Sequence, residues 1–190
     1  MKEYFSIIYK PERTFKELMQ NDDGQHGRRT NIIILLTILL PMSFIMLYEV
    51  LFPLIPNSNS SPLSPRLAMY ILPMVFGIII YFIIFKYLIP FLIHTIGKHY
   101  SHKAGNIAQT RFIVAFSLIP ILLISPLKTP YFIDYPVILA TINILLVLAA
   151  ISSMIILFVG TRLIYQVENK QNILIILPYI ILMVLGYIIG

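Results

Sequence analysis

The chain contains no cysteine among its 190 residues. This absence excludes disulfide bonds, iron–sulfur clusters, thiolate zinc sites and cysteine nucleophiles. Charged residues are also scarce, at 12%, whereas hydrophobic residues make up 58% of the chain. Because about a quarter of a typical soluble domain is charged, this composition predicts a membrane protein.

The short motifs of common enzymes are missing as well. The sequence has no HExxH, GxSxG, P-loop or GxGxxG motif, and no pair of carboxylates on one predicted helix. The apolar segments hold no clear ion pair and no carboxylate at mid-depth, which argues against a proton-coupled transporter. No inverted repeat is evident. We therefore expect a protein that is not an enzyme and that has no catalytic residue, cofactor or resident metal.

Three histidines fall close together in the basic stretch around residues 97–110. They are His94, His99 and His102. Their spacing is loose, no Asp, Glu or Cys accompanies them, and the nearby lysines repel a cation. This pattern favours a solvated loop lying against lipid phosphates over a metal site. Whether these histidines have any role stays open at this stage.

Long apolar runs dominate what the chain does contain. A helix of about 20 apolar residues is long enough to cross a bilayer. The sequence predicts an all-α, polytopic integral membrane protein, with a cytoplasmic segment at 1–29 and a single transmembrane domain at 30–190. The five predicted spans are residues 31–52, 67–86, 107–127, 137–160 and 173–189.

The third span is predicted to be the crossing around which the others pack. Arg111 lies near its start, where a long side chain can reach the headgroups. Pro120 lacks a backbone N–H and predicts a kink, and Ser117 is placed to help satisfy the freed backbone groups.

Two charged residues mark the ends of other predicted spans. The apolar run from Leu67 to Ile96 is too long for one perpendicular crossing, so we expect the span to end near Lys86 and the chain to continue along or past the interface, with a bend at Pro90. Glu49 lies near the far end of the first span. We interpret it as interfacial, and an ion or proton site is the alternative.

The fourth span carries polar side chains, Thr141 and Asn143. Small residues that allow close helix packing follow them, namely Ala149, Ser153 and Gly160. We interpret the polar groups as contributors to helix packing. The alternative is that Asn143, Thr141 and Ser117 line the path of a small-solute channel or permease.

The segment before the first span predicts an amphipathic helix that begins near Pro11. Its apolar stripe consists of Phe15, Leu18 and Met19. The basic residues beside the stripe are Lys10, Arg13 and Lys16. The favoured interpretation places this helix in the membrane interface, where it contacts anionic lipids. The alternative is a helix docked on the protein itself.

The distribution of Lys and Arg predicts the orientation of the chain. Eleven of these residues fall on one side of the predicted spans: Lys2, Lys10, Arg13, Lys16, Arg28, Arg29, Lys98, Lys103, Arg111, Arg162 and Lys170. The other side has Arg66 and Lys128. We therefore expect a cytoplasmic N-terminus and a C-terminus outside. The expected partners are the bilayer, anionic lipids, and a protein partner or a second copy of the chain, but not nucleic acid.

Three stretches resemble the Yip family, the Ypt/Rab-interacting proteins, in its bacterial inner-membrane branch. They are IYKPERTFKELM before the first span, FIVAFSLIPILL in the third, and FVGTRLIYQVENKQNILIILP from the fourth into the fifth. The Asp-Leu-x-Gly-Pro signature of eukaryotic members is missing. The resemblance implies five spans, an inner-membrane location and a non-enzymatic role in membrane organisation or trafficking-like interaction.

Overall fold

The structure is a computed structural model that describes residues 2–20, 26–51, 75–101, 105–128 and 135–189. These residues form helices and no strands. The bounds are α1 Lys2–Tyr9, α2 Pro11–Gln20, α3 His26–Leu51, η2 Ile84–Leu88, α5 Ile89–Tyr100, α6 Ile107–Ser117, α7 Ile119–Ile124, η3 Ser125–Leu127, α8 Pro136–Tyr165 and α9 Asn169–Ile189. An all-α fold is therefore confirmed.

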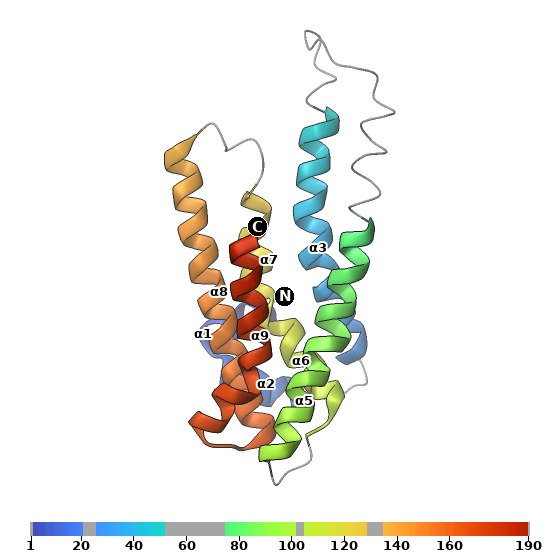
Figure 1. The fold of residues 1–190 in the computed structure, drawn as a ribbon, viewed down its shortest axis with the longest axis vertical. Helices are drawn as coiled ribbons and strands as arrows, with labels where there is room; N and C mark the ends of the chain where they lie inside the picture. The colour runs from blue at the N-terminus through green and yellow to red at the C-terminus, as the bar shows by residue number, and fades with distance from the viewer. Residues whose placement is uncertain (1, 21–25, 52–74, 102–104, 129–134, 190) are drawn as a thin grey trace.

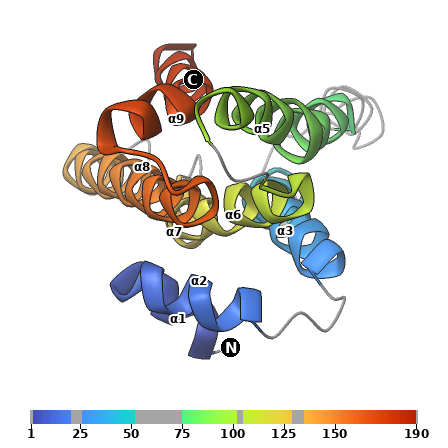
Figure 2. The ribbon, with the colours of Figure 1, turned by 90° about the horizontal axis from the view of Figure 1, so that it is seen from below.

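The long helices form a bundle, and α1 and α2 lie against one side of it, near its lower end (Figure 1). Seen from that end, α6 and α7 lie between α8 and α3, while α9 and α5 form the next layer (Figure 2). Within the described residues, four helices are long and apolar enough to cross a membrane, where the sequence predicted five. They are Val75–Tyr100, Ile107–Leu127, Pro136–Tyr165 and Asn169–Gly186. These apolar helices make the chain a multi-pass membrane protein.

The predicted first span, 31–52, is not among these four. It corresponds to α3, a continuous helix that begins earlier than predicted, at His26. The extra first turns carry Arg28 and Arg29, which lower the hydropathy of the described part, and the side chains beyond Phe44 lie outside the described residues.

The centre of the bundle is α6, as the sequence predicted for the third span. It contacts α3, α5 and α8, and every residue from Phe112 to Pro120 is buried. An Asn106 capping box starts this helix: the Asn106 side chain accepts a hydrogen bond from the Ala108 N–H at 2.9 Å, and Gln109 accepts one from the Asn106 N–H. The chain thus enters the core with its first backbone donors satisfied.

The kink predicted at Pro120 is present as a break between α6 and α7 at Leu118. The Leu118 N–H donates to the Ala115 carbonyl at 3.1 Å, a tighter turn than an α-helix makes. The Ser117 hydroxyl donates to the Val114 carbonyl at 2.7 Å, so it satisfies a backbone acceptor beside the break. Pro120 is therefore accommodated without an exposed backbone end.

The second predicted span differs from the structure at its end. The helix does not stop near Lys86 but continues to Tyr100. A π-helical turn, Ile84–Leu88, lies just before Pro90, and the Ile89 N–H donates to the Ile84 carbonyl. The wider turn moves backbone carbonyls away from the proline ring, so the helix continues through Pro90 without a break.

The predicted loop 161–172 is also much shorter than expected. The helix of the fourth span, α8, runs to Tyr165, and the helix of the fifth span, α9, begins at Asn169. Gln166 ends α8 in the left-handed conformation, with φ of 51°. The Thr161 hydroxyl donates to the Asn172 side-chain oxygen at 2.8 Å, so polar residues that led to the prediction of a loop instead join the ends of the two helices.

Candidate functional site

The apolar stripe of α2 packs against the bundle. Phe15 and Leu18 are 0% and 5% exposed, and Met19 packs against the same core. The Phe15 ring meets Phe112 and Phe116 edge-on, with centroid distances of 6.5 and 6.4 Å. The favoured interpretation, in which this stripe contacts lipid, is therefore wrong. The structure shows the alternative, a helix docked on the protein.

Polar contacts fix the corner that brings α2 into this position. The Thr14 hydroxyl donates to the Lys10 carbonyl at 2.9 Å and lies 3.0 Å from the Ser6 hydroxyl on α1. Ile7 of α1 is fully buried, so both short helices are anchored. The two N-terminal helices form one docked unit, which leaves the opposite face of α2 open.

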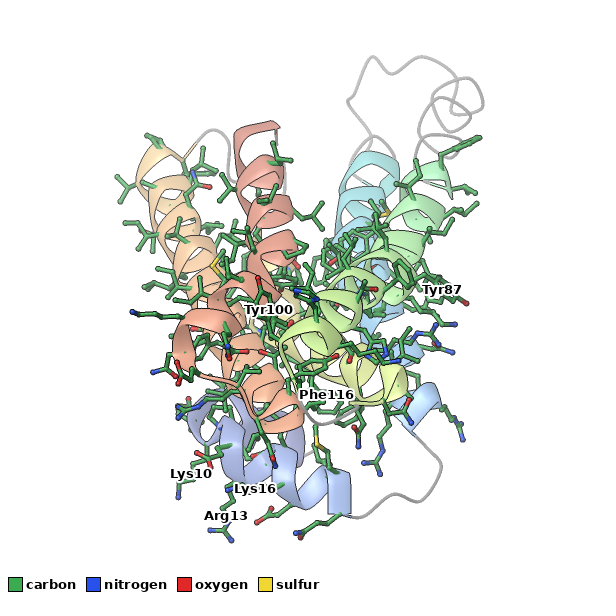
Figure 3. All side chains as sticks on the ribbon, turned by 60° about the horizontal axis from the view of Figure 1, so that its bottom comes forward. Lys10, Arg13, Lys16, Tyr87, Tyr100 and Phe116 are labelled. Carbon is green, nitrogen blue, oxygen red and sulfur yellow. The ribbon has the colours of Figure 1, made fainter. Side chains whose placement is uncertain are left out.

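The outer face of α2 is charged. Lys10, Arg13 and Lys16 point away from the bundle (Figure 3). Exposed ion pairs join Arg13 to Glu17 at 2.7 Å and Lys16 to Glu12 at 2.8 Å. The Lys16 ammonium lowers the pKa of the Glu12 carboxyl by hydrogen bonding and charge, and the Glu17 carboxylate raises the pKa of Arg13. This face therefore presents paired charges of both signs.

Between α2 and the end of α8 lies a surface cavity of about 540 Å³. Its walls combine apolar and charged side chains, namely Glu12, Lys16, Phe158, Val159, Arg162, Leu163, Gln166 and Val167. A second cavity of about 660 Å³ continues along the outer face of α2. The docked helix thus creates a groove lined by both apolar and charged side chains.

The structure brings Lys86 and Arg111 together, although they are distant in sequence. The Lys86 ammonium lies 4.8 Å from the Phe82 ring centre and 5.1 Å from the Tyr87 ring centre. The Arg111 guanidinium carbon lies 5.3 Å from the same Tyr87 ring. Tyr87 is on the outside of the bundle (Figure 3). The tyrosine therefore holds both cations at one place by cation–π contacts.

A buried hydrogen-bond group joins three helices below this cluster. The Tyr165 hydroxyl lies 2.7 Å from the Thr110 hydroxyl and 3.1 Å from His94 Nδ1. The Ser101 hydroxyl donates to the Tyr165 carbonyl at 2.5 Å. The ring packs so closely on Gly97 that a Cβ there would lie 2.6 Å from it. Tyr165 of α8 therefore ties α8 to α5 and α6.

A second buried group lies beside the break in the third span. The Tyr179 hydroxyl of α9 contacts the Ser153 hydroxyl of α8 and accepts a hydrogen bond from Ser117 at 3.4 Å. All three residues are 0% exposed. These hydroxyl groups form contacts that hold α6, α8 and α9 together.

A comparison with protein-family models identifies the family of the chain. The model of the Yip1 domain matches residues 5–190. The chain belongs to the Yip1 domain family. The resemblance seen in the sequence is thereby confirmed. No curated protein and no solved structure matches the chain.

The residues considered for a solute path do not line a common path in this Yip1 domain. Asn143 and Thr141 are exposed on α8, and the Thr141 hydroxyl donates to the Val137 carbonyl of its own helix. Ser117 is buried beside Tyr179. The channel alternative therefore loses the arrangement that motivated it.

The remaining residues considered for an ion or metal site do not come together in one place in the described part of the chain. Glu49 belongs to α3, but its side chain lies outside the described residues. His94 contacts Tyr165, His99 packs edge-on against Tyr100, and His102 lies outside the described residues. In the part of the Yip1 domain that the structure describes, no group of three His, Cys, Asp or Glu side chains could hold a metal ion.

Sequence reasoning missed the tyrosines that organise these sites. Tyr87 directly follows Lys86, and an aromatic residue beside a lysine near a membrane boundary was the available signal for an interfacial cluster. Tyr165 and Tyr179 gave no such signal, because their partners come from other helices of the Yip1 domain.

Proposed function

We propose that this Yip1 domain protein is a non-enzymatic membrane protein that acts through interactions at its cytoplasmic end, in a role of membrane organisation. The docking of α1 and α2 carries the proposal. Phe15 and Leu18 face the core, and the outer face of α2 carries charge next to a groove. A surface with paired charges of both signs suits the polar rim of a protein interface better than it suits contact with an anionic lipid surface.

The topology that supports this role has five crossings. The helix α3 has 26 residues, which correspond to about 39 Å at 1.5 Å per residue. It contacts α6 and exposes apolar side chains outward, namely Ile32, Leu35, Leu36, Leu39 and Leu40. With α3 as a crossing, the N-terminus and residue 190 lie on opposite sides. The excess of Lys and Arg supports a cytoplasmic position for α2, and the membrane proposed is a bacterial inner membrane.

In-cell photocrosslinking tests the proposal. A photoreactive residue at Arg13, on the outer face of α2, should give adducts with protein, identified after co-purification. The matched control is the same residue at Ile144, which is exposed on the apolar surface of α8 and should give lipid adducts. Only lipid adducts at Arg13, or flux of small solutes through proteoliposomes of the purified protein, would contradict an interaction role.

A further inference from the structure

One side-chain donor of Arg111 has no hydrogen-bond partner among the described residues. Its Nε is buried, and no acceptor lies within hydrogen-bond distance among the described residues. In that same part of the chain, carboxylates pair with cations on α2, between Arg13 and Glu17 and between Lys16 and Glu12. Among the described residues, no such pair includes Arg111 or Lys86. Two neighbouring cations that lack a carboxylate partner among the described residues would be stabilised by a ligand that supplies anionic oxygens.

The surroundings of Lys86 are apolar and open. Ile83, Tyr87, Leu88 and Phe91 are all exposed around Lys86. Tyr87 lies on the outside of the bundle, away from α1 and α2 (Figure 3). A ligand reaching Lys86 and Arg111 therefore meets charge and a large apolar surface together, which are the two features of a phospholipid.

The depth of the cluster also fits a headgroup. Arg111 and Lys128 lie near opposite ends of the helix Ile107–Leu127. Their separation of 17 residues corresponds to about 26 Å along a helix, close to the roughly 30 Å hydrocarbon core. If Lys128 lies at one membrane surface, Arg111 lies near the other, where the phosphates are. This step rests on the membrane orientation proposed above.

We propose that Lys86, Tyr87 and Arg111 form a binding site for the phosphate of an anionic phospholipid in the cytoplasmic leaflet. The guanidinium donates hydrogen bonds to the phosphate oxygens, and the lysine ammonium adds charge. The Tyr87 ring holds both cations in place, and the acyl chains lie along the exposed apolar side chains of the same helix.

Lipid titrations of the purified full-length protein, followed by native mass spectrometry, test the site. Phosphatidylglycerol is compared with phosphatidylcholine of the same acyl chains. The native protein should prefer phosphatidylglycerol. Lys86→Gln and Arg111→Gln should each weaken that preference about fivefold, since each basic residue near an anionic surface contributes a factor of that order. Arg111→Lys and Tyr87→Phe should retain most of it.

The matched control is the double variant Lys98→Gln with Lys170→Gln, which removes two exposed cations at the same end of the bundle. It should keep the preference. An equal loss in this control would show general charge attraction and overturn the site, as would an unchanged preference in Lys86→Gln with Arg111→Gln. Displacement of the lipid by millimolar inorganic phosphate would assign the cluster to a soluble phosphate instead. If Arg111→Gln does not fold, Lys86→Gln alone decides.

This experiment is independent of the interaction role. It measures lipid binding in detergent and uses no partner protein. Loss of the lipid preference would leave the photocrosslinking result at Arg13 unaffected, and failure of that crosslinking would leave the lipid site standing.

Discussion

At the scale of single residues, Tyr165 connects more than one helix through its hydroxyl group. Its hydroxyl reaches Thr110 on one helix and His94 on another, at 2.7 and 3.1 Å. Tyr165→Phe keeps the ring but removes the hydroxyl from both contacts, and Thr110 then retains only its long hydrogen bond to the Asn106 carbonyl, at 3.3 Å. We expect it to lower the free energy of unfolding by about 1–3 kcal/mol, measured as a fall in the melting temperature in detergent.

The control for this variant is Tyr9→Phe, because the Tyr9 side chain is 82% exposed. Removing its hydroxyl should leave the melting temperature unchanged. An unaltered melting temperature in Tyr165→Phe would mean that the hydrogen bonds across α5, α6 and α8 contribute no net stability.

Gly160 lies at a close helix contact of the fourth span. A Cβ at this position would lie 2.5 Å from Ile113 and 3.0 Å from the Phe15 ring. Gly160→Ala should therefore destabilise the protein by about 1–3 kcal/mol through overpacking. Gly186→Ala is the matched control, since nothing lies within 4 Å of a Cβ there, and it should be neutral or slightly stabilising. Equal melting temperatures for the two variants would contradict the close approach.

These two residues differ in how far sequence could reveal them. Gly160 shares α8 with other small residues, Ala149 and Ser153 among them, and small residues are typical of helix contacts in membranes. The role of Tyr165 depends on partners 71 and 55 residues away. Only the assembled bundle brings those partners together, so no local pattern could predict them.

At the scale of secondary-structure elements, the docking of α2 is the main difference from the sequence-based interpretation. An apolar stripe at Phe15, Leu18 and Met19 suits a lipid interface and a protein surface equally well. The distinction comes from the receiving surface, where Phe112 and Phe116 of α6 meet Phe15. That surface exists only after the third and fourth spans have packed.

Phe15→Ala tests this docking. The variant should lose about 3–5 kcal/mol, the usual cost of truncating a buried phenylalanine, and this loss should fall mainly on α1 and α2. Hydrogen exchange should show faster exchange at residues 6–20, with α8 and α9 still protected. Lys16→Ala, at an exposed position of the same helix, should leave exchange unchanged. Uniformly faster exchange over the whole bundle would show that α2 does not unfold separately.

At the scale of the whole molecule, the buried core lies toward one end. The side chains of α8 between Val137 and Leu148 are mostly exposed, whereas those from Ile156 to Tyr165 are mostly buried. Bilayer thickness determines the length of an apolar run, so the third span, 107–127, was predicted with its observed bounds. The helices of the second and fourth spans, Val75–Tyr100 and Pro136–Tyr165, are longer than a bilayer crossing needs. Their last turns pack on other helices, and hydropathy alone could not predict where they end.

The absence of cysteine allows a direct test of the topology. Single replacements Lys98→Cys and Lys128→Cys place one thiol at each end of the bundle, at the end of α5 and just after η3. With the N-terminal end in the cytoplasm, a membrane-impermeant maleimide added to intact spheroplasts should label Lys128→Cys. It should label Lys98→Cys only after permeabilisation. Both positions are exposed, so access to the thiol depends on the membrane and not on burial. Labelling of Lys98→Cys in intact spheroplasts would reverse the orientation and place Lys86, Arg111 and the docked α2 helix on the outer surface.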